Sequence, residues 1–210
     1  MLPLLLTRDD IGIHLTCELV VDGATWPCFS HTIEHADGLV LVDTGMIEST
    51  TELDEVFHPT VHPLSGEIVE RVAQVVITHM HFDHHGANRL FPGVPIHVQR
   101  IELGDARTKD DYTILEWIDF PDANYVEHDG EAEILPGIRI VPAPGETRGH
   151  QIVVVETDEG PVVLGGDVGH TFRELGQADT SGKRLVLELA APTYLAHVRE
   201  PHVPHPNAYR

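Results

Sequence analysis

The sequence is poor in positive charge. Only two of its 210 residues are lysines, Lys109 and Lys183, and 13 lysines and arginines stand against 34 aspartates and glutamates, which gives a formal net charge of −21. A nucleic-acid surface needs clustered basic side chains that replace counterions on phosphate, and an anionic membrane attracts the same kind of cluster. The composition therefore argues against nucleic-acid and membrane partners. We interpret most of the acidic excess as a solvated surface.

Cysteine and long apolar runs are also scarce. Cys17 and Cys28 are the only cysteines, too few for a disulfide framework and wrongly spaced for a thiolate metal site, so we expect both to be buried as small apolar side chains. No apolar run approaches the roughly 20 residues that span a membrane. The stretch 1–10 lacks the basic segment of a signal peptide, and we expect a cytoplasmic protein.

The length and the apolar content fit one domain over residues 1–210. A chain of this size buries about 70% of its unfolded surface, and no linker divides it. β-branched runs predict strands, among them 74–78 and 151–157, whereas 66–73, 99–106 and 183–190 favour helices. Runs of strands with helices between them predict a mixed sheet of the α+β class with helices packed outside.

Local signals refine this outline. Asp22-Gly23 between two apolar segments is typical of a tight hairpin turn. Further helices are predicted over 47–57 and 86–91, and the segment 107–124 has the least pattern.

Histidine is abundant, with 16 copies, and the motif His79-Met80-His81-Phe82-Asp83-His84 follows the predicted strand 74–78. Where the loop turns after the strand, we expect His79 and His81 to point to one side, and Asp83 and His84 to another. Imidazole and carboxylate ligands suit zinc, manganese, iron or cobalt. These four donors exceed what one four-coordinate ion with its water needs, so the motif predicts two ions.

Other ligand-type side chains also lie where predicted strands begin or end. His150 closes a glycine-rich turn before a strand, Asp167 follows two glycines after a strand, and His197 follows the last strand. Open sheets place their sites at such strand ends. Asp167 has two carboxylate oxygens and is therefore suited to bridging two cations.

In this order the motifs resemble the metallo-β-lactamase superfamily of hydrolases over nearly the whole chain. Within it, the sequence looks most like the N-acyl-homoserine lactone lactonases. The supporting residues are Leu41-Val42-Asp43-Thr44-Gly45-Met46, His81-Phe82-Asp83-His84 with Gly86 and Asn88, Val98-Gln99-Arg100, and Lys183-Arg184-Leu185 with Pro192 before His197. The resemblance implies a four-layer αβ/βα sandwich.

The resemblance also implies a role for each ligand. One ion would be held by His79, His81 and His150, the second by Asp83, His84 and His197, and Asp167 would bridge them. Asp43 would support the site without binding an ion. His202 is the alternative to His197 as the last ligand, and we expect His85, His202 and His205 to lie at the surface.

Two positions depart from the pattern of the family. Glu146 stands where the turn 144–150 usually has a histidine, which is not normally a ligand. His170 stands three residues after Asp167, where the lactonases carry a tyrosine that hydrogen-bonds the substrate carbonyl. We expect the His170 imidazole to donate in its place, with a different specificity.

The sequence therefore predicts a hydrolase with two divalent ions, zinc in the first place, that acts on a small-molecule lactone or carboxylic ester. A water shared by two cations loses its proton near neutral pH and can attack a carbonyl. Asp83 or Asp167 would pass a proton to the leaving oxygen. The alternatives are a thioesterase of the glyoxalase II kind or a β-lactam hydrolase on the same fold, and, from another class, a non-catalytic or di-iron metal-binding protein. The sequence gives no oligomeric state.

Overall fold

The computed structural model describes residues 6–189 and 191–199. The strands of the first sheet are β1 (Ile11–Val21), β2 (Ala24–Ile33), β3 (Leu39–Val42), β4 (Thr60–Val61), β5 (Val72–Val76), β6 (Pro95–Gln99) and β7 (Asn124–His128). Those of the second sheet are β8 (Ala132–Leu135), β9 (Ile138–Pro142), β10 (Gln151–Thr157), β11 (Gly160–Leu164) and β12 (Thr193–Tyr194). The strand orders are β4-β1-β2-β3-β5-β6-β7 and β12-β11-β10-β9-β8.

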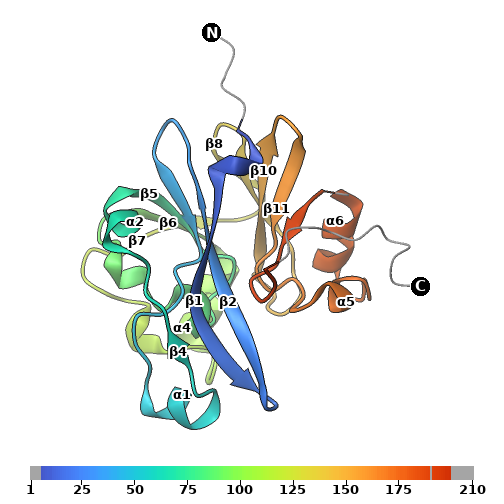
Figure 1. Cartoon of the computed structure of the whole chain (residues 1–210). Coiled ribbons are helices and arrows are strands. Elements are labelled where there is room, and N and C mark those ends of the chain that lie inside the picture. The colour runs from blue at the N-terminus through green and yellow to red at the C-terminus, as the bar shows by residue number, and fades with distance from the viewer. Residues whose placement is uncertain (1–5, 190, 200–210) are drawn as a thin grey trace.

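Helices cover the outer faces of the two sheets (Figure 1). The helices of the described residues are α1 (Thr51–Val56), α2 (Gly66–Arg71), α3 (Phe82–His85), α4 (Arg100–Thr108), α5 (Phe172–Leu175) and α6 (Ser181–Leu189). Helices α2 and α4 pack on the first sheet, whereas α5 and α6 pack on the second. The mixed sheet structure with outer helices, in four layers, is the predicted fold and is confirmed.

The core between the sheets follows the alternation of side chains along each strand. In β10, Val153 and Val155 pack against the first sheet, whereas Ile152 and Val154 pack against α5 and α6. Because successive residues of a strand point to opposite faces, both faces of this strand are buried. Each fully buried valine or isoleucine contributes about 1.5–3 kcal/mol to stability, which explains the unbroken apolar run in the sequence.

Strands β1 and β2 form the long hairpin that the sequence predicted. Asp22 and Gly23 at its tip have φ of 52° and 78°, the pair of positive values that a type I′ turn requires. The pairing shifts register between Leu15 and Cys17. Cys17 and Cys28 are paired across the hairpin and are both buried, as expected.

The direction of the strands gathers several loops at one end of the sandwich. Strands β3 and β5 are parallel, as are β11 and β12, whereas β10 runs antiparallel to β11. The loops after β3 and β5 therefore share one end of the first sheet, and the loops after β11 and β12 and before β10 share one end of the second. The contact between His84 and Asp167 shows that these two ends lie side by side. These are the loops in which the sequence places the ligand-type residues.

Some predicted helices differ from the observed ones. The helix predicted over 47–57 is only α1, because the Thr50 side chain accepts a hydrogen bond from the Leu53 N–H and starts the helix there. The one predicted over 86–91 is a three-residue 3₁₀ helix (Asn88–Leu90), and α3 precedes it within the histidine motif. No helix in residues 6–189 and 191–199 is long and apolar enough to span a membrane.

Candidate metal centre

The loop after β5 carries the histidine motif and is fixed by one buried carboxylate. Asp43, which follows β3, accepts hydrogen bonds from the Thr78 backbone N–H at 2.7 Å and from the Thr78 hydroxyl at 2.8 Å. Asp43 has φ +58°, a left-handed backbone conformation that is uncommon for residues other than glycine and is held here by the surrounding contacts. The ends of β3 and β5 are thereby joined next to His79.

The same carboxylate orients His84. Its Nδ1 lies 2.8 Å from Asp43 Oδ2, and because a carboxylate accepts hydrogen bonds, the Nδ1–H donates. The opposite nitrogen, Nε2, lies 3.2 Å from Asp167 Oδ2. Although burial opposes the charged ring, Asp167, Asp83 and Asp43 raise the pKa of His84 well above its usual value, so Nε2–H donates to Asp167, and a metal ion at this place would displace that proton. Asp43 thus contacts the far side of a candidate ligand, which is the supporting position that the resemblance implied.

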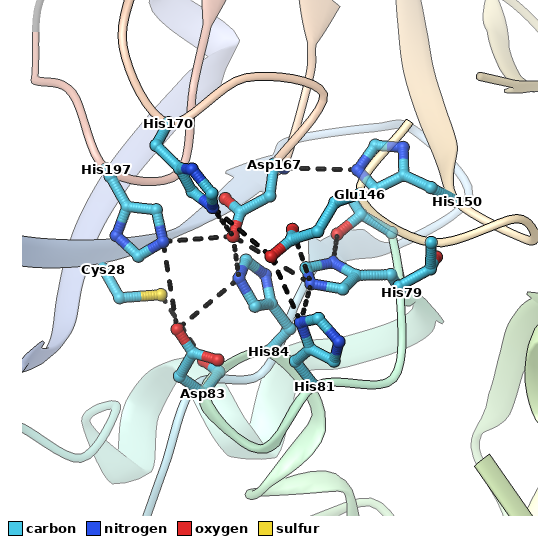
Figure 2. A network of polar contacts seen from close by, with 12 residues as sticks. Cys28, His79, His81, Asp83, His84, Glu146, His150, Asp167, His170 and His197 are labelled. Carbon is cyan, nitrogen blue, oxygen red and sulfur yellow. Dashed lines mark hydrogen bonds and ion pairs between the residues drawn. The ribbon is translucent and has the colours of Figure 1, made fainter. Parts of the chain in front are cut away.

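His79 and His81 point toward a common place. Their facing nitrogens, His79 Nε2 and His81 Nδ1, lie 3.0 Å apart (Figure 2). Burial and then the neighbouring His84 and His81 lower the pKa of His79 well below its usual value. The ring of His79 is therefore neutral at neutral pH and can offer a lone pair to a metal ion.

Asp83 and His84 come from α3 and not from a continuing loop. The chain turns into this short helix directly after His81, whose carbonyl accepts from the His85 N–H at 3.2 Å. The turn carries Asp83 Oδ2 to 3.7 Å from His84 Nε2 and to 3.9 Å from His197 Nε2. The His84 ring centroid nevertheless lies 4.1 Å from that of His79, and both residues share a donor group with Asp167, so the division of the motif between two ions stays a prediction.

Asp167 lies at the centre of the candidate site. Its Oδ2 lies 3.1 Å from His197 Nε2, 3.2 Å from His84 Nε2 and 3.9 Å from His79 Nε2. Although burial opposes ionisation, the neighbouring His197 and His84 hold the pKa of Asp167 well below its usual range. Its second oxygen, Oδ1, is buried and has no hydrogen-bond partner among the described residues.

His197 is brought to this cluster by the chain after β12. Its Nδ1 lies 2.7 Å from the carbonyl oxygen of Pro27 in β2, so the Nδ1–H donates and Nε2 faces Asp167. Burial favours the neutral ring, but Asp167 outweighs it and raises the pKa of His197 to about 9. The alternative ligand His202 lies outside the described residues, as does His205.

His150 is buried next to the cluster but is oriented differently from the other histidines. Its Nε2 accepts a hydrogen bond from the Asp167 backbone N–H at 3.2 Å, and its Nδ1 has no partner among the described residues. Its ring centroid lies 5.3 Å from that of His79. The structure thus places His150 beside His79, with the lone pair of Nε2 turned toward the Asp167 backbone N–H.

Glu146 and His170, the two departures from the family pattern, meet over the cluster. Glu146 Oε1 lies 3.3 Å from His170 Nε2, and Glu146 Oε2 lies 3.3 Å from His79 Nε2. Burial raises the pKa of Glu146, but His170 and His81 outweigh it and leave a net lowering, and Glu146 raises the pKa of His170. The sequence analysis gave a site role to His170 but treated Glu146 only as a departure from the family turn, although its unusual place in the turn 144–150 was the available signal.

Cys28 is buried as expected but lies beside the candidate ligands, whereas His85 differs from its expected position. Cys28 Sγ lies 3.4 Å from the Asp83 carbonyl oxygen and in a group with Asp83, His84 and His197. Contact with Cys17 and then burial hold the pKa of its thiol well above the usual value, so the thiol is protonated in the ion-free chain. The surface position predicted for His85 is wrong. This ring is fully buried because α3 turns it inward, where Nε2 lies 2.6 Å from Thr113 Oγ1.

The described residues contain four groups of donor atoms, and within each group the atoms lie no more than 4.8 Å apart. They are Cys28, Asp83, His84 and His197; His79, His84 and Asp167; His79, His81 and Glu146; and Asp167, His170 and His197. Neutral imidazoles and carboxylates are the donors that divalent first-row ions accept. Together with the unpartnered Asp167 Oδ1, this donor set fits the bound cations that the sequence predicts.

A cavity of about 700 Å³ opens above these donors. Apolar side chains form most of its wall: Leu19, Val21 and Trp26 of the hairpin, Leu53, Val56 and Phe57 at α1, and Phe82 and Ile114. His81, Asp83, Asp167, His170 and His197 line the same space. The volume suits a small molecule, and the cavity brings an apolar ligand into contact with the polar cluster.

Comparison with known sequences gives a family for this arrangement. The profile described as "Metallo-beta-lactamase superfamily" matches residues 23–201. An N-acyl homoserine lactonase of Bacillus sp is 31% identical in an alignment 188 residues long that covers 80% of this chain and 72% of the relative. That of Bacillus cereus is 30% identical in an alignment 180 residues long that covers 76% of this chain and 69% of the relative.

Solved structures give the same result for the fold. A quorum-quenching N-acyl homoserine lactone lactonase has a TM-score of 0.74 at 23% identity, and a quorum-quenching N-acyl homoserine lactone hydrolase has 0.73 at 25% identity. Each comparison covers 93% of this chain and 94% of the other. The resemblance predicted from the motifs is confirmed.

Proposed function

Because the chain belongs to the metallo-β-lactamase superfamily, we propose that it is a hydrolase with two divalent metal ions that opens neutral lactones or cleaves carboxylic esters. N-acyl-homoserine lactones, the substrates named for its relatives, are the first substrate class to test. The observation that carries this proposal is the apolar cavity that ends on a cluster of imidazoles and carboxylates.

The ions would be held as the resemblance implies, by His79, His81 and His150 and by Asp83, His84 and His197, with Asp167 between them. Zinc is the first expectation, and manganese, iron or cobalt have the same ligand preferences. When bound, such ions supply Lewis acidity and lower the pKa of water to about 7.

The side chains around the cavity would provide the remaining steps. Asp83 and Asp167 line the cavity, and either carboxylate can pass a proton to the oxygen that leaves the carbonyl carbon. His170, with its ring edge-on to Trp26 at a centroid distance of 5.4 Å, lines the same space and can donate a ring N–H to the substrate carbonyl oxygen. The apolar wall would hold an acyl chain and keep water away from it.

The charge of the cavity outside the candidate ligands favours a neutral substrate over an anionic one. Glu52 and Asp111 line the cavity outside the donor groups, and no lysine or arginine of the described residues lines it. A β-lactam with its carboxylate, or a glutathione thioester, would enter against this field, whereas a lactone carries no charge. This feature separates the proposed activity from the thioesterase and β-lactamase alternatives.

A hydrolysis panel with the metal-loaded protein tests the proposal. We expect kcat/KM for an N-acyl-homoserine lactone to exceed that for a β-lactam and a glutathione thioester by about 100-fold or more. The double variant Glu52→Gln with Asp111→Asn should raise kcat/KM for the anionic substrates by about threefold and leave the lactone unchanged. The double variant Glu67→Gln with Glu70→Gln, at exposed positions of α2, is the charge-matched control. Cleavage of a β-lactam or thioester without lactone hydrolysis would refute the proposal.

A further inference from the structure

Glu146 contacts both histidines that begin the motif. Its Oε2 lies 3.3 Å from His79 Nε2, and its Oε1 lies 3.4 Å from His81 Nδ1. The two nitrogens are 3.0 Å apart, and all three donors converge on one place (Figure 2). Donors that share an ion at about 2.0–2.1 Å are separated by about 3.0–3.4 Å in tetrahedral or octahedral geometry. The three separations fall in this range.

His150 does not occupy this place. Among the described residues, the donor group that includes His81 also contains Glu146 and does not contain His150. The His150 Nε2 instead accepts the hydrogen bond from the Asp167 N–H. Of the two side chains contributed by the turn 144–150, the carboxylate is therefore the one that faces the His79–His81 pair.

The turn that carries Glu146 is tied to the histidine loop by a common anchor. The fully buried Glu102 accepts from the Met80 backbone N–H at 2.8 Å and from the Thr147 hydroxyl at 2.8 Å. Met80 lies between the two histidines, and Thr147 follows Glu146. The Glu102 carboxylate thus fixes both segments in the folded chain. Because the histidine loop and the turn with Glu146 are already held together, little conformational entropy is lost when an ion binds between them.

From this geometry we propose that the Glu146 carboxylate is a direct ligand of the ion held by His79 and His81. The inference rests on the metal centre proposed above and adds a ligand that the family resemblance does not give. A carboxylate in place of an imidazole is a harder, negatively charged donor. The ion at this position should therefore be one that binds oxygen ligands well. The ratio of Mn²⁺ affinity to Zn²⁺ affinity should be higher than at a site made of imidazoles alone.

The experiment measures metal binding directly. Protein freed of metal with a chelator is titrated with three ions in turn. Mn²⁺ binding is followed by electron paramagnetic resonance of the free ion, and Zn²⁺ binding by competition with a chromophoric chelator. Co²⁺ binding is followed by visible absorption. We expect Glu146→Gln to lower the Mn²⁺ affinity by at least about tenfold and the Zn²⁺ affinity less. The Co²⁺ spectrum should change, since the ion loses a charged ligand. Glu146→His should recover Zn²⁺ binding but not Mn²⁺ binding.

A matched control is available on the other side of His170. Glu174 Oε2 lies 3.2 Å from His170 Nδ1 and is outside the donor groups. Glu174→Gln removes a carboxylate from the same histidine and should leave the Co²⁺ spectrum unchanged.

If Glu146→Gln and Glu146→His both retain the Mn²⁺ affinity and Co²⁺ spectrum of the wild type, Glu146 is not a ligand, whatever happens to hydrolysis. If the wild type and the variants bind metal as expected but no lactone is cleaved, the ligand assignment holds and the proposed function fails.

Discussion

The first sheet supplies its donor side chains from one loop, whereas the second sheet supplies them from three separate ones. The six-residue stretch 79–84 after β5 carries four of them, His79, His81, Asp83 and His84. Asp43 fixes this segment from the end of β3. On the other side, His150, Asp167 and His197 come from the loops before β10, after β11 and after β12.

Both departures from the family pattern, Glu146 and His170, lie on the side of the second sheet. Both residues also line the cavity. On the proposed function, the first sheet would provide the ligands of the histidine motif, whereas the second sheet would adjust the preference for ion and substrate. The following predictions test this division.

The largest effect is expected at the residue that joins the two sides. Asp167→Ala removes the carboxylate between His84 and His197, so lactone hydrolysis should fall by at least about 10³-fold. Steady-state kinetics with the metal-loaded variant measure the loss. Asp158→Ala, in the exposed β10–β11 turn, is the control. Turnover near the wild-type rate in the Asp167 variant would contradict its central role.

A smaller effect is expected at the anchor between the two sides. Glu102 accepts hydrogen bonds from the Met80 N–H, the Thr147 hydroxyl and the Tyr112 hydroxyl. Glu102→Ala leaves these donors buried without a partner, and we expect the free energy of unfolding to fall by about 1–3 kcal/mol or more. Urea unfolding of the metal-free protein measures it. An unchanged midpoint would show that the loops are held independently.

A third effect depends on pH and concerns the buried His85 beside the motif. Burial lowers its pKa to about 3, so below about pH 6.5 the unfolded chain takes up a proton that the folded chain does not. Stability should therefore fall as the pH decreases from 6.5 toward 3, by about 1.4 kcal/mol per pH unit for this histidine. His85→Gln should reduce the slope by that amount in urea unfolding across this range. An identical slope in the variant would assign the acid sensitivity to other histidines, such as His31, whose pKa burial lowers to about 4.

Much of the fold was predictable because its determinants are local. The Asp22-Gly23 turn, the β-branched strand β10 and the strand before His79 all depend on the conformational preferences of neighbouring residues. The helix α3 was missed because a four-residue helix has almost no periodicity, and its formation depends on packing within the motif.

The sequence by itself determined the kind of chemistry. Four histidine and aspartate ligands within six residues, followed by His150, Asp167 and His197 at strand ends, are sufficient to predict a metal centre on this fold. The tertiary structure decided which donor atoms face one another. It turned the His150 nitrogen toward the Asp167 backbone, buried His85 and brought Glu146 to His79 and His81. These outcomes depend on loop conformations and contacts between residues far apart in the chain, which no local pattern in the sequence encodes.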